Sequence, residues 1–248
     1  MKIGILDSGI GGLTVLKECL KQIPNHNYLY FADSKNAPYG TRPKNQVLEL
    51  TKKSVSFLIA KGAEIIVIAC NTATSVAAAE LREIYNIPII GMEPAVKPAL
   101  EQASSKRVLV TATELTLKSD KFLELVQTLD AQKVVDLCPL PQLVEFAETG
   151  EFSIEKVLPY LRDAFSTFDL DLYGSLVLGC THFPLYRSAF ERILSKKVLI
   201  FDGSYGTVKR IREFVSSESS PPSIQLFLSG TPLVEGQLFD RIQLILKD

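Results

Sequence analysis

Two stretches decide the fold: IIVIACNT at residues 65–72 and SLVLGCTH at residues 175–182. Each is a short run of Ile, Val and Leu that leads to a cysteine, with polar side chains directly after it. Apolar runs of this length between polar residues indicate buried parallel strands. We therefore expect Cys70 and Cys180 at the carboxyl ends of two strands, where open α/β sheets bind their ligands.

The composition indicates a soluble globular chain with no polyanionic partner. With 248 residues, 46% of them hydrophobic, the chain is long enough to bury the core of one large or two smaller domains. Its 27 Lys and Arg residues against 28 Asp and Glu residues give a net charge of −1, which excludes an obvious basic surface for nucleic acid or an anionic membrane. No apolar run approaches the roughly 18 residues of a membrane span.

The cysteines favour a reducing compartment. Cys19, Cys70, Cys138 and Cys180 lie far apart and without C-x-x-C spacing, which suits neither a disulfide framework nor a zinc site. The chain begins directly with the strand-like residues 3–6, so we expect no signal peptide and no leading extension. Both observations predict a cytoplasmic protein.

Strand-like and helix-like segments alternate along the chain. We expect strands near residues 2–6, 28–32, 64–69, 87–91, 107–112, 133–137, 175–179, 197–201 and 224–229. Helical patterns lie at residues 13–22, 44–61, 75–85, 118–129, 154–167, 185–196, 206–215 and 233–247. This alternation predicts an α/β fold with mainly parallel sheets flanked by helices. Residues 216–222 read as a surface loop.

Similar features recur at similar offsets, which predicts two lobes of one architecture. The two cysteines form one pair of strand ends, and Asp7 and Thr111 mark another. We expect residues 1–94 plus 207–248 to form the first lobe and residues 95–206 the second, with crossings between them near residues 93–98 and 201–204. A pseudo-twofold relation would then bring both clusters of strand ends to one cleft.

The segment DSGIGG at residues 7–12 follows the first strand and opens a helix, where a phosphate-binding loop would lie. As a dinucleotide fingerprint it fails, because Thr14 stands where a third glycine or alanine belongs. Asp33, after the second strand, resembles a ribose-binding acid and keeps a nucleotide site open as an alternative. A tight turn explains the glycines, whereas Asp7 and Ser8 are not needed for it.

The settings of Cys70 and Cys180 favour chemistry over packing. A lone cysteine at a strand end is commonly a small buried hydrophobe, and we interpret Cys19 and Cys138 in this way. Cys70 and Cys180 each lie at or just before a helix N-terminus, which favours the thiolate. His182 lies two residues beyond Cys180, as a proton partner would. A metal site would need further Cys or His residues nearby, so we expect no metal.

Two further segments have both a structural and a functional interpretation. Residues 37–40, APYG, form either a simple proline turn or the wall of a pocket. Glu145, Glu148 and Glu151 have the spacing of a solvated helical face, although one of them could serve the site.

The ordered set of motifs resembles the cofactor-independent glutamate racemases. The matching segments are DSGIGG at 7–12, PYG at 38–40, ACNTA at 69–73, Thr113-x-x-Thr116, Cys138-Pro139 and GCTHFPL at 179–185. They follow the order of that family and span nearly the whole chain. The resemblance implies two α/β lobes with a site in the cleft between them, commonly a homodimer, no cofactor, and supply of D-glutamate for bacterial peptidoglycan.

The resemblance also implies roles for individual residues. It makes Cys70 and Cys180 the two acid/base groups, with Asp7 assisting the first and His182 the second. The substrate-contacting pairs match Asp7-Ser8, Tyr39-Gly40, Asn71-Thr72 and Thr181-His182, and a carboxylate-binding turn matches Thr113 and Thr116.

A further acidic residue of the family best matches Glu148. Residues 139–148 are longer than the family's usual pattern and altered, so Glu145 remains a rival. Because no N-terminal extension precedes the first strand, the precursor-activated control of one branch of the family is not expected.

Racemisation removes the α-proton from one face of an amino acid and returns a proton to the other face. Two thiols on facing lobes supply that geometry, one acting as thiolate and one as thiol. The alternatives are an aspartate racemase, a thiol hydrolase that uses Cys180 and His182, and a binding module without chemistry. A hydrolase needs one nucleophile and a binding module needs none, whereas a racemase needs both cysteines.

Overall fold

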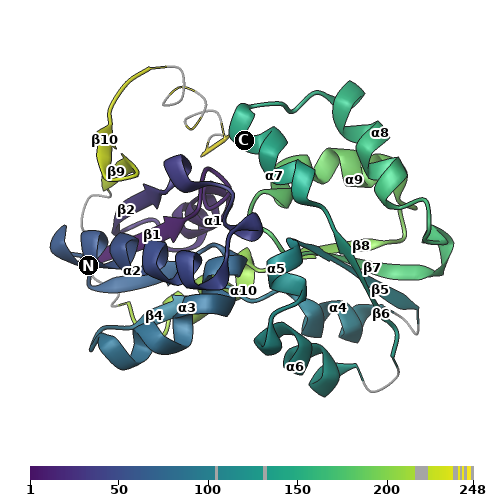
Figure 1. The fold of residues 1–248 in the computed structure, drawn as a ribbon, viewed down its shortest axis with the longest axis horizontal. Coiled ribbons are helices and arrows are strands. Elements are labelled where there is room, and N and C mark those ends of the chain that lie inside the picture. The colour runs from purple at the N-terminus through teal and green to yellow at the C-terminus, as the bar shows by residue number, and fades with distance from the viewer. Residues whose placement is uncertain are drawn as a thin grey trace.

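The chain forms two sheets, each covered by helices on both faces (Figure 1). The computed structural model describes residues 1–103, 106–130, 133–215 and 223–236, together with residues 240, 242, 245 and 246. The six-stranded sheet has the order β10-β9-β2-β1-β3-β4 and the four-stranded sheet the order β6-β5-β7-β8. All pairings are parallel except that of β9 with β10. We refer to each sheet with its helices as a lobe.

The strands of the first lobe are β1 (Lys2–Asp7), β2 (Asn27–Ala32), β3 (Ile65–Ile68), β4 (Ile89–Gly91), β9 (Ser223–Leu228) and β10 (Thr231–Leu233). Those of the second lobe are β5 (Arg107–Ala112), β6 (Val135–Pro139), β7 (Tyr173–Leu178) and β8 (Leu199–Asp202).

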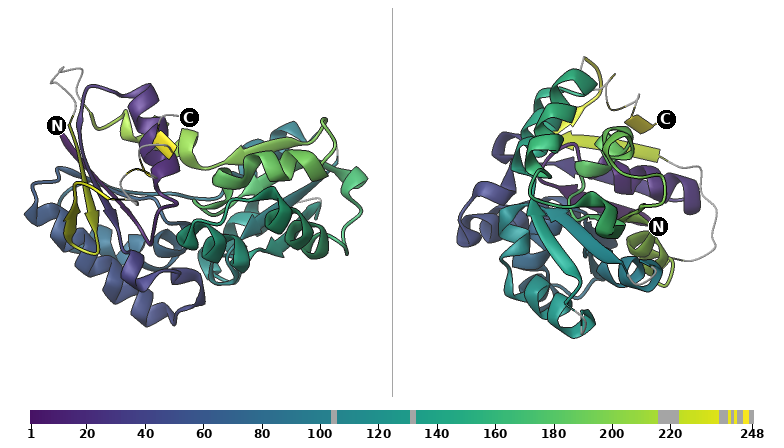
Figure 2. Two further views of the ribbon diagram at one scale, coloured as in Figure 1. Left: turned by 90° about the horizontal axis from the view of Figure 1, so that it is seen from above. Right: turned by 90° about the vertical axis from the view of Figure 1, so that its right-hand side faces the viewer.

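The helices pair on opposite faces of the sheets (Figure 2). The first lobe carries α1 (Leu13–Gln22) with α10 (Ser204–Ile211) on one face and α2 (Lys44–Ala60) with α3 (Asn71–Ile84) on the other. The second lobe carries α4 (Val96–Gln102), α5 (Glu114–Leu117), α6 (Asp120–Leu129), α7 (Pro141–Thr149), α8 (Ile154–Ala164) and α9 (Arg187–Ile193). Short 3-10 turns are η1 (Ser34–Asn36), η2 (Tyr39–Thr41), η3 (Leu170–Leu172) and η4 (Phe183–Tyr186).

The apolar runs form strands because helices bury both faces of the sheets. All four residues of β3 and all six of β7 are buried, and alternate side chains enter different cores. Ile66 and Ile68 pack toward α2 and α3, whereas Ile65 and Val67 belong to a core that continues into the second lobe as far as α7, α8 and α9. This shared core joins the two lobes.

The α/β class with two lobes is confirmed, and each of the nine expected strands has a counterpart. The helix expected at 75–85 begins earlier, at Asn71, and α4 begins within the segment 93–98 that leads from the first sheet to the second. The antiparallel edge strand β10 was not expected. The expected loop 216–222 lies outside the described residues, as does part of the expected helix 233–247. The proposed residue boundaries of the lobes stay a prediction.

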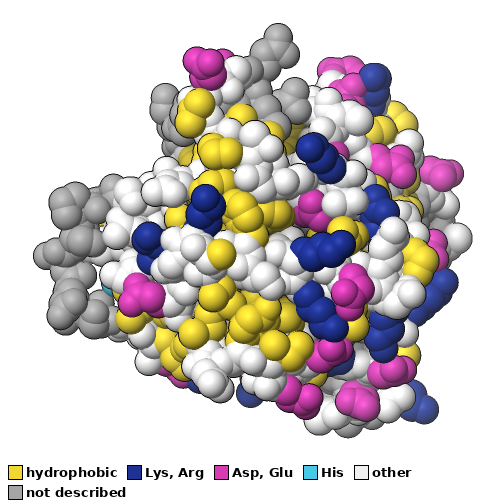
Figure 3. Space-filling model, turned by 60° about the vertical axis from the view of Figure 1, so that its left-hand side comes forward, with side chains coloured by type: hydrophobic (Ala, Val, Ile, Leu, Met, Phe, Trp, Pro, Cys, Tyr) yellow, Lys and Arg dark blue, Asp and Glu magenta, His cyan; other side chains and the backbone are white. Residues whose placement is uncertain are grey.

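The surface carries both apolar and charged areas. Figure 3 shows one face, on which hydrophobic side chains gather near the centre and lower edge, while most Lys and Arg side chains lie on the right, interspersed with Asp and Glu. In the described ranges no helix has the length and hydropathy needed to cross a membrane.

Candidate active site

The carboxyl ends of strands from both sheets meet at one place. Asp7 ends β1, Cys70 follows β3, Thr113 follows β5 and Cys180 follows β7. Direct hydrogen bonds join the two lobes here: Thr181 Oγ1 donates to Asp7 Oδ2 over 2.9 Å, and the hydroxyl groups of Thr72 and Thr113 are also 2.9 Å apart. The site is therefore built from strand ends of both lobes.

Cys70 caps the N-terminus of α3 through its own side chain. Its Sγ accepts a hydrogen bond from Ala73 N at 3.4 Å, and the residue is 5% exposed. Burial raises the pKa of Cys70 to about 12, and the negative charges of Asp7 and Cys180 act in the same direction. The hydrogen bond from Ala73 opposes them. In this arrangement Cys70 is a neutral thiol at physiological pH.

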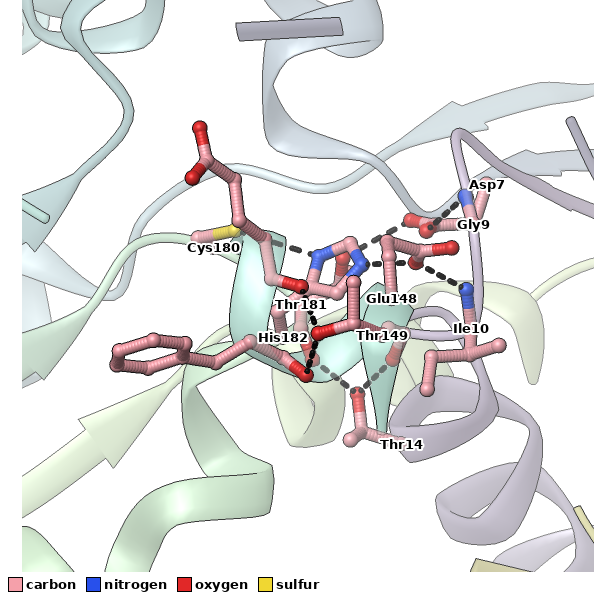
Figure 4. A network of polar contacts seen from close by, with 12 residues as sticks. Asp7, Gly9, Ile10, Thr14, Glu148, Thr149, Cys180, Thr181 and His182 are labelled. Atoms are coloured by element: carbon pink, nitrogen blue, oxygen red, sulfur yellow. Dashed lines mark hydrogen bonds and ion pairs between the residues drawn. The ribbon is translucent and has the colours of Figure 1, made fainter. Parts of the chain in front are cut away.

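Cys180 belongs to a relay with His182 and Glu148 (Figure 4). The Sγ of Cys180 lies 3.7 Å from His182 Nδ1, and His182 Nε2 lies 2.6 Å from Glu148 Oε1. Burial alone lowers the pKa of His182, but its hydrogen bonds and charge interactions with Cys180 and Glu148 raise that pKa well above its ordinary value. This raised pKa favours the protonated imidazole, and a cation beside a sulfur atom stabilises thiolate charge.

Glu148 reaches the site from the end of α7. Its Oε1 also accepts a hydrogen bond from Ile10 N at 2.8 Å, so one carboxylate oxygen bridges the two lobes. A Cβ atom on Gly9 would overlap this carboxylate, which explains why the loop after β1 has no side chain there. Glu145 is exposed one turn earlier, whereas the Glu148 side chain is only 17% exposed. Glu148 therefore does not belong to a solvated helical face.

Asp7 is fully buried between the lobes. Its Oδ1 accepts from Gly9 N at 3.0 Å, and its Oδ2 accepts from Thr181. Burial raises the pKa of Asp7 above its usual value, while the positive charge of His182 acts against that rise. The carboxylate is thus tied to the loop of Cys180, and it acts on Cys70 through its charge. Ser8, beside it, is buried as well.

Hydroxyl and amide groups supply the polar surface of the site. The hydroxyls of Thr72, Thr113 and Thr116 form a triangle with sides of 2.9, 3.0 and 3.0 Å. Both polar atoms of the Asn71 side chain are buried and have no hydrogen-bond partner among the described residues. A buried amide without a partner is costly, which suits a group that awaits a ligand.

Tyr39 and Gly40 lie in η2, next to the second lobe. The Tyr39 hydroxyl donates to Asp33 Oδ2 at 2.7 Å, so it is already engaged within the protein. Asp33 also accepts from Asn36 and Ser229. These bonds occupy the carboxylate that the nucleotide alternative would have used for a ribose.

The sequence did not reveal the hydrogen bonds that hold the Tyr39 turn and the loop after β1 in place. Sequence reasoning singled out Asp33 but not its bond to Tyr39, and it did not identify Tyr30, whose buried hydroxyl donates to Gly9 O at 2.6 Å. Cys19 and Cys138 are buried away from this set of residues, and Cys138 Sγ donates to Ala164 O. Among the described residues, no three His, Cys, Asp or Glu side chains gather in a way that could hold a metal.

Comparisons with known proteins agree with this architecture. The family model for Asp/Glu/hydantoin racemases matches residues 3–210. The glutamate racemase of Halothermothrix orenii is 51% identical over 215 residues, which cover 87% of this chain and 85% of that protein.

Two solved structures are similar over nearly the full length. The Escherichia coli glutamate racemase, in complex with L-glutamate and the activator UDP-MurNAc-Ala, gives a TM-score of 0.85 at 25% identity and covers 99% of this chain and 94% of that one. The Francisella tularensis glutamate racemase, in complex with D-glutamate, gives a TM-score of 0.83 at 26% identity. The match covers 100% of this chain and 94% of that one. From its fold, its strand-end residues and these matches, we conclude that the chain belongs to the Asp/Glu/hydantoin racemase family.

Proposed function

We propose that this protein interconverts L- and D-glutamate without a cofactor, using Cys70 and Cys180 as its two acid/base groups. One observation carries the proposal: two thiols from different sheets enter one site in different electrostatic settings. Burial and Asp7 hold Cys70 as a thiol, whereas the cation of His182 stands beside Cys180. A racemase needs this pairing of one proton donor with one proton acceptor.

In one direction, the thiolate of Cys180 removes the α-proton of glutamate and becomes a thiol. The bonding electrons stay on the α-carbon as a planar carbanion, and the Cys70 thiol gives its proton to the opposite face. Cys70 is then the thiolate, with the backbone N–H of Ala73 directed at its sulfur. The reverse reaction starts from that state, so the two cysteines exchange roles with each turnover.

Uncharged donors stabilise the negative charge of the substrate. The hydroxyls of Thr72, Thr113 and Thr116 can turn from one another toward a carboxylate, and the Asn71 amide can donate to it. Charge-assisted hydrogen bonds are about twice as strong as neutral ones, which favours that exchange. We assign Ser8, Tyr39, Gly40 and Thr181 to the remaining substrate contacts and the Asp7 carboxylate to the substrate ammonium group.

The alternatives use fewer of these residues. A thiol hydrolase built on Cys180, His182 and Glu148 would leave the second thiol without a task, and a binding module would need neither. Relatives solved with L-glutamate and with D-glutamate support the choice of substrate. We further propose a cytoplasmic homodimer that supplies D-glutamate for peptidoglycan.

The proposal predicts that pure protein, treated with chelator and free of added pyridoxal phosphate, racemises glutamate in both directions. In D2O each enantiomer should gain deuterium at its α-carbon, because the thiol that returns the proton exchanges with solvent. Proton NMR together with circular dichroism measures both processes. Activity that disappears with chelation and returns with a metal would contradict the mechanism.

Glutamate should be preferred to aspartate by roughly 10³-fold or more in kcat/KM. Donors placed for the longer diacid would stay unpaired with the shorter one, which costs several kcal/mol. Parallel circular dichroism assays with L-glutamate and L-aspartate measure the ratio. Equal rates would refute the specificity while leaving the two-thiol mechanism intact.

A further inference from the structure

Asp33 is a buried acid that the proposed reaction does not use. It follows β2 at the same edge of the sheet as Asp7, and its backbone N–H donates to Asp7 O over 3.0 Å. The residue is 5% exposed. A buried carboxylate is unfavourable unless hydrogen bonds satisfy it, so its partners indicate what it does for the structure.

Three side chains from three segments donate to this carboxylate. The Tyr39 hydroxyl lies 2.7 Å from Oδ2, the Asn36 amide lies 3.1 Å from both oxygens, and the Ser229 hydroxyl lies 2.9 Å from Oδ1. Tyr39 belongs to η2, Asn36 to η1, and Ser229 to the turn between β9 and β10. Asp33 thereby ties the η1–η2 segment to the rim of the first sheet.

That segment also contacts the second lobe. A Cβ atom on Gly40 would lie only 2.6 Å from Thr113 Cβ, so the backbone of η2 rests directly on a residue of the threonine triangle. A displacement of η2 would therefore change the space in front of Thr113. Asp33 is thus linked to the substrate-binding surface through two contacts: its hydrogen bond with Tyr39, and the packing of Gly40 against Thr113.

We propose that Asp33 is a positioning residue that holds the Tyr39–Gly40 turn against Thr113 and so sets the affinity for substrate. The proposal rests on the proposed glutamate racemase function for its kinetic part. It concerns binding more than chemistry, because Asp33 contacts neither cysteine nor the relay of His182. Its loss should therefore affect KM more than kcat.

The test compares Asp33→Asn, which replaces the charged acceptor with a neutral amide, with Tyr39→Phe, which removes the hydroxyl that donates to it. We expect each to raise the KM for glutamate about tenfold, the scale of a hydrogen bond to a charged group, with kcat changed less than about threefold. If both act through this bond, the double variant should be hardly worse than Asp33→Asn alone.

A matched control lies in the second sheet, at the amino ends of its strands and so away from the site at their carboxyl ends. Tyr173 donates to Asp136 Oδ2 at 2.7 Å, the same bond at the same length, where β6 and β7 begin. Asp136→Asn and Tyr173→Phe should lower stability without changing the KM. Equal KM changes in the two pairs, or no KM change in Asp33→Asn, would overturn the proposal.

Hydrogen exchange tests the positioning without any assay of activity. The backbone bonds from Asn36 N to Asp33 O and from Arg42 N to Tyr39 O hold the η1–η2 segment. Asp33→Asn should speed the exchange of amides at residues 34–42, and Asp136→Asn should not. Unchanged exchange would overturn the proposal even if the wild type racemises glutamate. Faster exchange would support it even if the wild type does not act on glutamate.

Discussion

Serine in place of either Cys70 or Cys180 is expected to lower kcat/KM for glutamate by about 10³-fold or more, the upper range for loss of an acid/base group. A serine hydroxyl is a far weaker acid than a thiol and cannot hold the charge that each half of the reaction requires. Circular dichroism at substrate concentrations well below KM measures the loss. A single variant that still racemises at the wild-type rate would exclude that cysteine as a base.

The two remaining cysteines provide a close control. Burial raises the pKa of Cys19 to about 12, as for Cys70, and that of Cys138 to about 11. Cys19→Ser and Cys138→Ser should leave kcat/KM within a fewfold of wild type, because neither thiol belongs to the site. If the loss came only from burying a serine hydroxyl in place of a thiol, kcat/KM would fall by a similar factor in all four Cys→Ser variants.

The second large effect is expected from Glu148→Gln. Glutamine keeps the shape but removes the charge that, together with Cys180, raises the pKa of His182, so the pKa of the imidazole falls and its positive charge stabilises a thiolate at Cys180 less. We expect kcat/KM to fall by about 10²–10⁴-fold, the usual range for acid–base assistance. Glu145→Gln, one turn earlier on the same helix and exposed, should have little effect.

The same variant should change how stability depends on pH. Because the folded-state pKa of His182 is raised, the stability it contributes is complete below the unfolded pKa and is lost as the pH rises through the folded value. The slope approaches about 1.4 kcal/mol per pH unit between the two values. Urea unfolding from pH 6.5 upward should show this decline in wild type and in Glu145→Gln, and a much weaker decline in Glu148→Gln. Equal slopes in all three would show that Glu148 does not hold the proton on His182.

Isotope effects separate the two sides of the substrate. His182→Asn should slow proton transfer at Cys180, and Asp7→Asn should slow transfer at Cys70. With α-deuterated L- and D-glutamate, each variant should therefore show unequal primary isotope effects in the two directions. Identical changes for both variants in both directions would contradict these side-specific roles.

The sequence predicted the features that depend on local pattern. The apolar runs before Cys70 and Cys180 are strands because each is fully buried, and the polar residues after them come together because parallel strands end at one edge. The links across the lobes were not predictable in this way. Glu148 and Ile10 are 138 residues apart in the chain, and Ser229 and Asp33 are 196 apart, so their contacts depend on how complete lobes pack. A helix N-terminus was expected next to Cys70, but the helical pattern itself was recognised only from residue 75, because a cysteine side chain caps α3 in place of the usual Ser, Thr, Asp or Asn.

The threonine triangle gives substrate binding a conformational cost. Thr72 comes from one lobe, and Thr113 and Thr116 from the other, and their three hydroxyls are bonded to one another. The molecules that bind substrate are those in which these hydroxyls have turned from their neighbours toward the carboxylate. The apparent dissociation constant equals the intrinsic one divided by the fraction of such molecules, so a site that holds this arrangement about one-tenth of the time binds about tenfold more weakly than its contacts alone would allow.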